Sequence, residues 1–342
     1  MAHISNIIDA DGHLRDTERE YREYIEEPYR SRRRVGPGAG GGGGFDNTLG
    51  QTLGTWKVTP QIWLDLLDKA GVETTVLYPT SGLGLGQVRE ADYAVALCRA
   101  YNNFVAEEYL KTSSRLQAVA LLPPQDPIAA TEELRRAVQV LGLKGAMLPS
   151  DGPYLLGKPQ FHPIYQEAER LGCAIAIHGS GQIWDGVDQY QMDKFIQVHS
   201  ISHPFSQMRQ ITSVMFEGVF ERFPKLKIAF LEAGCTWVPF LLDRMDEKYE
   251  LRGKVEAPLL KKKPSEYVRH GSVYFSIEAE ETLLPEVMKF IGDSHILFAS
   301  DFPHWDSSFP HNMEELLERQ DLSDEQKTRI MRDNAKEFYA LP

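Results

Sequence analysis

Short apolar runs alternate with helical segments along almost the whole chain, and this alternation restricts the fold more than any other feature. The runs are rich in Val, Ile, Leu, Ala and Phe without strict polar alternation, which is typical of parallel strands covered on both faces. The eight expected strands lie at 7–10, 75–78, 116–122, 145–148, 173–177, 227–231, 273–277 and 296–299. Helical patterns between or after them lie at 90–112, 126–140, 162–170, 204–220, 283–290 and 323–341.

This order of strands and helices predicts an α/β protein with a (β/α)8 TIM barrel. The alternative, a doubly wound open sheet, usually carries a glycine fingerprint after its first strand, where this chain has Asp11-Gly12-His13.

Two segments do not follow the repeat and are interpreted as long loop insertions after strands one and five. The first covers about residues 14–60 and includes the glycine-rich loop 36–44, which suits neither helix nor strand. The second is 179–202, which contains Trp184. We expect one domain over residues 1–342, with both insertions near the substrate site, because loops that follow barrel strands form its functional face.

Composition excludes several classes of partner. With 37 Lys and Arg against 49 Asp and Glu, the net charge is −12, which argues against nucleic acid. No apolar stretch approaches the ~20 residues that cross a bilayer, and the first residues do not resemble a signal peptide. The cysteines, Cys98, Cys173 and Cys235, have no metal-binding spacing and suit a reducing compartment. We therefore expect a cytoplasmic protein that binds a small-molecule substrate and neither nucleic acid nor membrane.

Metal-ligand residue types stand at the ends of three expected strands. Asp11 and His13 are two residues apart, so on an extended strand their side chains point the same way. His178 ends the fifth apolar run and Asp301 follows the eighth. Together these four side chains form a mixed nitrogen and oxygen set that suits Zn²⁺, Mn²⁺ or Fe²⁺. The alternative is four unrelated capping groups.

Five motifs carry a resemblance to a known family over about residues 7 to 340. They are Asp-Ala-Asp-Gly-His at 9–13, Ile-His-Gly at 177–179, His-Pro-Phe at 203–205, the stretch 218–228, and Ala-Ser-Asp-Phe-Pro-His at 299–304. In this combination the chain resembles the amidohydrolase-related (amidohydrolase-2) family, which includes aminocarboxymuconate-semialdehyde and resorcylate-type decarboxylases. The resemblance implies a distorted TIM barrel that holds zinc or manganese through Asp11, His13, His178 and Asp301. It also implies a homodimer, since family members often pair.

The resemblance implies two reactions. In hydrolytic members, metal-bound water attacks a carbonyl and the aspartate equivalent to Asp301 takes its proton. In the decarboxylases, the metal holds the substrate carboxylate while an acid protonates carbon.

Glu232 is the main departure from the family pattern. The family's decarboxylases usually place a histidine in this turn, whereas this chain reads Phe230-Leu231-Glu232-Ala233-Gly234. Glu232 could be a proton relay, a further metal ligand, or the partner of a cation such as Arg244. A carboxylate-rich site would also suit iron or a second metal.

Four further residues are candidates for the site. His203 precedes Pro204 at the start of a helical pattern, where it either caps that helix or contacts the site as a catalytic side chain. Trp184, His304 and Trp305 are candidate substrate-binding residues, with a packing role as the alternative.

The sequence thus predicts a metal-dependent amidohydrolase-type enzyme, a hydrolase or a non-oxidative decarboxylase of a small organic acid or carbonyl compound. Asp301, Glu232 and His203 are the candidate catalytic residues. The alternatives are a carboxylate-rich non-haem iron oxygenase on the same barrel, and a non-catalytic binding protein with a relic metal site.

Overall fold

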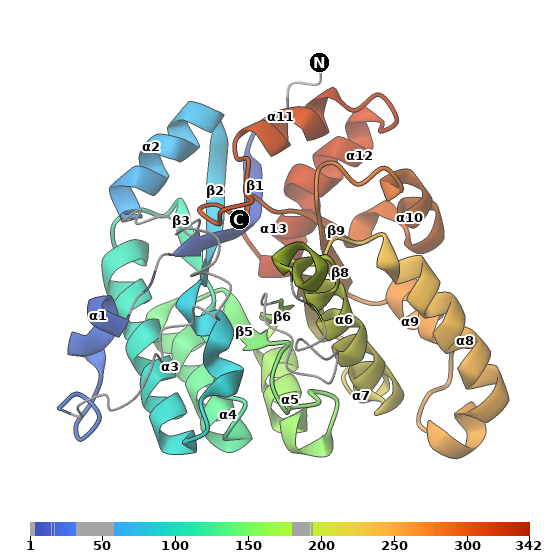
Figure 1. The fold of residues 1–342 in the computed structure, drawn as a ribbon, viewed down its shortest axis with the longest axis horizontal. Helices are drawn as coiled ribbons and strands as arrows, with labels where there is room; N and C mark the ends of the chain where they lie inside the picture. The colour runs from blue at the N-terminus through green and yellow to red at the C-terminus, as the bar shows by residue number, and fades with distance from the viewer. Residues whose placement is uncertain (1–3, 15, 17, 32–57, 180–191, 193) are drawn as a thin grey trace.

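The structure, a computed structural model, describes residues 4–14, 16, 18–31, 58–179, 192 and 194–342. Trp184 and the glycine-rich loop 36–44 lie outside these residues. Strands occupy the middle of the molecule and most helices lie around them, so that the chain forms an inner β layer and an outer α layer (Figure 1).

All strands in the described part of the chain pair in parallel. They form a three-stranded sheet in the order β1-β2-β3 and a six-stranded sheet in the order β4-β5-β6-β7-β8-β9. Their bounds are β1 Ile7–Leu14, β2 Val72–Pro79, β3 Leu116–Ala118, β4 Ala120–Leu121, β5 Gly145–Pro149, β6 Ala174–His178, β7 Lys227–Leu231, β8 Val273–Ile277 and β9 Ile296–Phe298.

Backbone hydrogen bonds connect the two sheets at both ends. Between β3 and β4 only Val119 intervenes, and its N–H donates to the carbonyl of Leu77 in β2 (3.2 Å). On the other side, the N–H of Asp301, just after β9, donates to the carbonyl of Asp11 in β1 (3.0 Å). The parallel strands, with helices between them and first and last strands side by side, fit the predicted distorted barrel.

Helices connect successive strands and cover their outer face. Their bounds are α1 Glu18–Tyr21, α2 Pro60–Ala70, α3 Ala91–Val105, α4 Pro127–Arg136, α5 His162–Leu171, α6 Phe195–Phe216, α7 Val219–Arg222, α8 Trp237–Glu256, α9 Pro264–His270, α10 Leu284–Ile291, α11 His311–Glu318, α12 Asp324–Thr328 and α13 Asn334–Tyr339. Local sequence explains where several begin. At α4, for example, the Asp126 carboxylate accepts hydrogen bonds from the N–H groups of Ile128 and Ala129, and Pro127 occupies the first turn.

Three elements differ from the sequence prediction. The expected third strand, 116–122, is divided at Val119 into β3 and β4, which pair with different neighbours. The helix expected to begin at Pro204 instead begins at Phe195 and runs through Pro204. Proline removes one backbone donor, and this long helix continues beyond that gap. The expected final helix 323–341 is α12, a π-helical turn at Arg329–Asp333 and α13 in succession.

The hydrophobic core is continuous from β1 to α13, and every residue of β1 is buried. Cys98, Cys173 and Cys235 are buried free thiols. The helices in the described residues are all too short or too polar to cross a lipid bilayer.

Candidate metal centre

The end of β1 is held in place by the buried carboxylate of Asp9. This carboxylate accepts hydrogen bonds from Thr75 Oγ1 (2.7 Å) and from Ser300 N and Oγ (both 2.8 Å). Asp9 therefore ties β1 to β2 and to the segment after β9, the three places from which site residues come. Gly12 is required here because a Cβ atom would lie 2.5 Å from Thr75 Oγ1.

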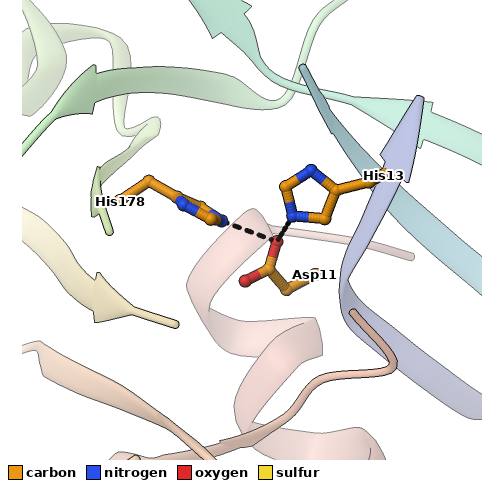
Figure 2. A group of neighbouring side chains, drawn as sticks. All are labelled: Asp11, His13 and His178. Carbon is orange, nitrogen blue, oxygen red and sulfur yellow. Dashed lines mark hydrogen bonds and ion pairs between the residues drawn. The ribbon is translucent and has the colours of Figure 1, made fainter. Parts of the chain in front are cut away.

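Asp11, His13 and His178 come together as predicted, from the ends of β1 and β6. His178 Nε2 lies 3.2 Å and His13 Nε2 3.4 Å from the same oxygen, Asp11 Oδ1. Figure 2 shows both rings pointing toward the Asp11 carboxylate from the two strands. All three side chains are buried.

Asp301 lies beside this group, as the sequence predicts. Its Oδ1 is 3.5 Å from His13 Nε2 and 2.6 Å from His304 Nδ1. Its φ of 51° is in the left-handed region, which is uncommon for a residue with a side chain and costs of order 1–3 kcal/mol. The same holds for Glu232, with φ 57°. Both positions follow barrel strands, after β9 and β7, and both carboxylates lie against the same cluster of histidines.

Glu232 lies on the far side of His178 from Asp11. Its Oε2 is 3.1 Å from His178 Nδ1, and its Oε1 is 3.3 Å from His304 Nδ1. The structure thus pairs Glu232 with histidines, and the ion pair with Arg244 is not among its contacts in the described residues. Three carboxylates and three histidines form a closed ring in the order Asp11, His178, Glu232, His304, Asp301 and His13.

Burial and the neighbouring charges separate the pKa values of the three histidines. Burial lowers the pKa of His13 to about 4. Burial also favours neutral His178, but the negative charges of Asp11 and Glu232 outweigh it and raise the pKa of His178 well above its usual value. For His304, Asp301 and Glu232 likewise outweigh burial and raise the pKa. His13 is therefore neutral with a free lone pair, whereas His178 and His304 hold protons between carboxylates.

The pKa values of the three carboxyl groups are shifted in different directions. Burial raises the pKa of Asp301 to about 7, an effect to which the charge of Glu232 adds and which His304 opposes. For Glu232 and Asp11, the adjacent His178 outweighs burial and lowers the pKa. A bound cation would change this balance, since its charge stabilises carboxylates and takes the place of a histidine proton.

The donor set fits a divalent ion. Atoms that bind one ion at ~2.1 Å lie ~3.0 to ~3.4 Å apart at octahedral and tetrahedral angles, close to the 3.2–3.5 Å spacings among these donors. Both ring nitrogens of His13 are buried without a hydrogen-bond partner among the described residues, which leaves Nε2 available as a ligand. A second group, His13, Asp301 and His304, has donors equally near one another but shares His13 with the first.

A cavity of about 510 Å³ opens beside Asp301 and Glu232. Apart from these two, its lining includes histidines and acids from α6, the segment after β8 and the segment after β9. These are His199, His203, Glu278, Glu280, Glu281 and Asp306.

The remaining predicted residues have different outcomes. His203 lies within α6, so it does not cap that helix, and its Nε2 faces Glu232 Oε2 at 3.9 Å on the cavity wall. Trp305 is 42% exposed and its ring meets that of His199 edge-on at 5.4 Å. Trp184 lies outside the described residues.

Sequence reasoning missed the extent of His304's involvement and the place of His199. His304 contacts Asp301, Glu232 and Thr80 Oγ1 (3.2 Å), and its ring lies 4.1 Å from that of His13. His199 Nε2 is 3.5 Å from Asp306 Oδ2. The spacing Asp301-x-x-His304 was the available signal for the first. No pattern in the sequence joins His199 to Asp306.

The amidohydrolase family profile matches residues 8–341, and the chain therefore belongs to this enzyme family. Among curated relatives, the chain is 27% identical over 290 residues to 2-amino-3-carboxymuconate-6-semialdehyde decarboxylase of Dictyostelium discoideum (82% of this chain, 77% of the relative). It is 26% identical over 290 residues to gamma-resorcylate decarboxylase of a Rhizobium species (81% and 86%).

A solved structure of similar fold is the dihydroxybenzoic acid decarboxylase of a Polaromonas species with bound manganese and an inhibitor, 2-nitroresorcinol. It matches with a TM-score of 0.79 and 20% identity, covering 99% of this chain and 98% of that one. The expected family and fold are confirmed.

Proposed function

We propose that this chain is a divalent-metal-dependent, non-oxidative decarboxylase of a small aromatic carboxylic acid. The observation that carries the proposal is the group of Asp11, His13 and His178 donors, spaced for one ion, beside a polar cavity. The relatives support the choice of decarboxylation over hydrolysis, because the curated and solved proteins reported above act on carboxylic acids as decarboxylases.

Asp11, His13, His178 and Asp301 would hold the ion, with manganese or zinc as the expected metal. The ion would bind the substrate carboxylate and stabilise negative charge that develops during the reaction. Glu232 acts on this set through His178. Its Oε2 lies 3.1 Å from Nδ1, which hydrogen-bonds to the Gly179 carbonyl (2.9 Å), and together these two groups hold the ring so that Nε2 faces Asp11.

Decarboxylation breaks a carbon–carbon bond, and the electron pair left on the ring carbon must receive a proton. Asp301 lines the cavity and is the acid that we assign to this step. His304 holds Asp301 in position through its 2.6 Å hydrogen bond and is itself held by Thr80. Carbon dioxide leaves, and the carbon carries hydrogen where it carried the carboxylate.

The test is incubation of the manganese-loaded protein with hydroxybenzoic acids whose carboxylate is isotopically labelled. We expect labelled carbon dioxide without consumption of oxygen and, in heavy water, one deuterium at the vacated ring carbon. Asp301→Asn should abolish release. Hydrolysis of an ester or amide panel with no carbon dioxide from any acid would contradict the proposal and support the hydrolase alternative. Consumption of oxygen in proportion to product would support the oxygenase alternative.

A further inference from the structure

The cavity beside the candidate metal centre is strongly acidic. Its lining contains six carboxylates, Glu232, Glu278, Glu280, Glu281, Asp301 and Asp306, and two imidazoles, His199 and His203. Among the described residues, this lining contains no lysine or arginine. A cavity of this composition has a negative potential that a bound molecule must match.

Three of these carboxylates already have strong partners. Glu232 and Asp301 belong to the ring of acids and histidines. Glu281 accepts hydrogen bonds from the N–H groups of Cys235 (2.7 Å) and Thr236 (2.8 Å), just before the start of α8.

The other three, which we call the acidic wall, are Glu278, Glu280 and Asp306. Asp306 faces His199 at 3.5 Å. Within the described part of the chain, the carboxylates of Glu278 and Glu280 have no hydrogen-bond or ion-pair partner. Both residues are exposed at the cavity rim and free to meet a ligand.

A substrate whose carboxylate binds the metal would point its opposite end, here called the far end, toward the acidic wall. A carboxylate group at the far end would meet like charges without an arginine, the side chain that normally binds carboxylates in proteins. An ammonium group would instead gain hydrogen bonds and charge attraction from Glu278 or Glu280. Building on the function proposed above, we propose that the acidic wall selects acids with one carboxylate for the metal and a positively charged far end, and that it rejects dicarboxylic acids.

The nearby acids also determine the pH at which ligand affinity should be measured. Although Glu278 is exposed at the rim, withdrawal from bulk water and the charges of Asp301 and Glu281 raise its pKa to about 8. Affinities are therefore measured above this pH and below about 10.4, the usual pKa of an alkyl ammonium group such as that of lysine. In that range Glu278 and the ammonium group of a ligand are both charged.

The probes are three salicylates that share the metal-binding carboxylate and hydroxyl groups. They differ only para to the hydroxyl, where one carries aminomethyl, one hydroxymethyl and one a second carboxylate. Calorimetry on the manganese-loaded protein gives their dissociation constants. We expect the aminomethyl compound to bind best and the dicarboxylate worst, with about a tenfold difference between them, or about 1.4 kcal/mol.

Matched variants show whether the acidic wall causes this selectivity. Glu278→Gln and Glu280→Gln should each narrow the difference in affinity between the aminomethyl compound and the dicarboxylate. Glu286→Gln should leave it unchanged, because Glu286 lies on α10 paired with Lys289 and outside the cavity lining. Two glutamate variants keep the test open if one fails to fold.

The outcomes separate the two proposals. Equal affinity for the three probes, tightest binding of the dicarboxylate, or a difference that neither glutamate variant narrows would overturn the role of the acidic wall alone. Failure of all three probes to bind the metal-loaded protein would overturn the proposed function, and the selectivity with it.

Discussion

The Nδ1 atom of His178 lies 3.1 Å from Oε2 of Glu232, on the opposite side of the imidazole from Nε2, which faces Asp11 at 3.2 Å. This places Glu232 behind a candidate metal ligand, where its carboxylate can orient the ring without touching the ion. Glu232 also contacts His304, the partner of Asp301. One carboxylate therefore contacts both a candidate metal ligand and the histidine that positions the proposed acid.

Replacing this carboxylate should weaken metal binding without abolishing it. In Glu232→Gln, the amide keeps the size of the side chain but loses the charge that favours the required form of His178. We expect the affinity for manganese to fall about 10–100-fold at unchanged stoichiometry. Titration against a competing chelator measures the affinity, with Glu286→Gln as control. A fall in stoichiometry would show that Glu232 is itself a ligand, and an unchanged affinity would show that it does not position His178.

The approach of the candidate ligands was predictable from the sequence because each member stands at the end of an apolar run. Parallel strands carry their carboxyl ends to one edge, so Asp11, His13, His178 and Asp301 had to approach one another once the strands were identified. The contact between Glu232 and His178 was not predictable. It depends on the direction of two side chains at strand ends, and Glu232 has a left-handed backbone conformation, which is uncommon for a residue with a side chain.

The fold shows the same division between local and tertiary effects. Apolar runs located each strand to within a few residues, but the division at Val119 arises from pairing with two different neighbours. Pro204 suggested a helix start, yet α6 runs through it because nearby side chains pack against the sheet: Gln207 donates to the carbonyls of Ile177 and Leu231. Local signals carry no information about such contacts.

Metal binding should stabilise the folded chain through His13. An ion that binds only the folded state adds about 4 kcal/mol to the free energy of unfolding at a thousand times its dissociation constant. We expect manganese to raise the midpoint of thermal unfolding of the wild type and to have little effect on His13→Ala. His311→Ala, at an exposed site on α11, is the control and should respond as the wild type does. An equal rise in the His13→Ala variant would place the ion elsewhere.

Asp16 should make stability fall as pH rises. Its carboxylate is buried. Oδ1 accepts from the N–H groups of Thr80 (2.8 Å) and Ser81 (3.0 Å), but Oδ2 has no hydrogen-bond partner in the part of the chain that the structure describes. Burial raises the pKa of Asp16 from 3.8 to about 7 in the fold. The neutral form is therefore the favoured one, and ionisation costs stability. This cost is absent below pH 3.8, grows as pH rises toward 7 and is complete above it, at a magnitude on the order of a few kcal/mol.

Asp16→Asn tests this sign, because asparagine cannot ionise and keeps the acceptor for Thr80 and Ser81. Relative to the wild type, the variant should gain stability as pH rises between about 4 and 7 and then stay level. Denaturant unfolding at a series of pH values measures the difference. A difference that is constant across this range would show that Asp16 titrates normally in the fold.

Gly12→Ala should damage both stability and metal binding, because Gly12 lies between two candidate ligands at the point where β1 meets β2. An added Cβ would lie 2.5 Å from Thr75 Oγ1 and 2.7 Å from Asp9 Oδ2, so the bond between these two side chains must shift. We expect a loss of about 1–3 kcal/mol in the free energy of unfolding, as for other overpacked cores. Gly84→Ala is the matched control, since nothing lies within 4 Å of the Cβ that it adds, and it should change stability by less than about 0.5 kcal/mol.

Because Asp9 holds the end of β1 against Ser300, a displaced Asp9 also moves Asp11 and His13 relative to Asp301. Manganese affinity should therefore fall in Gly12→Ala and not in Gly84→Ala, and a variant that lost stability but bound metal normally would show that the ligands do not depend on this contact.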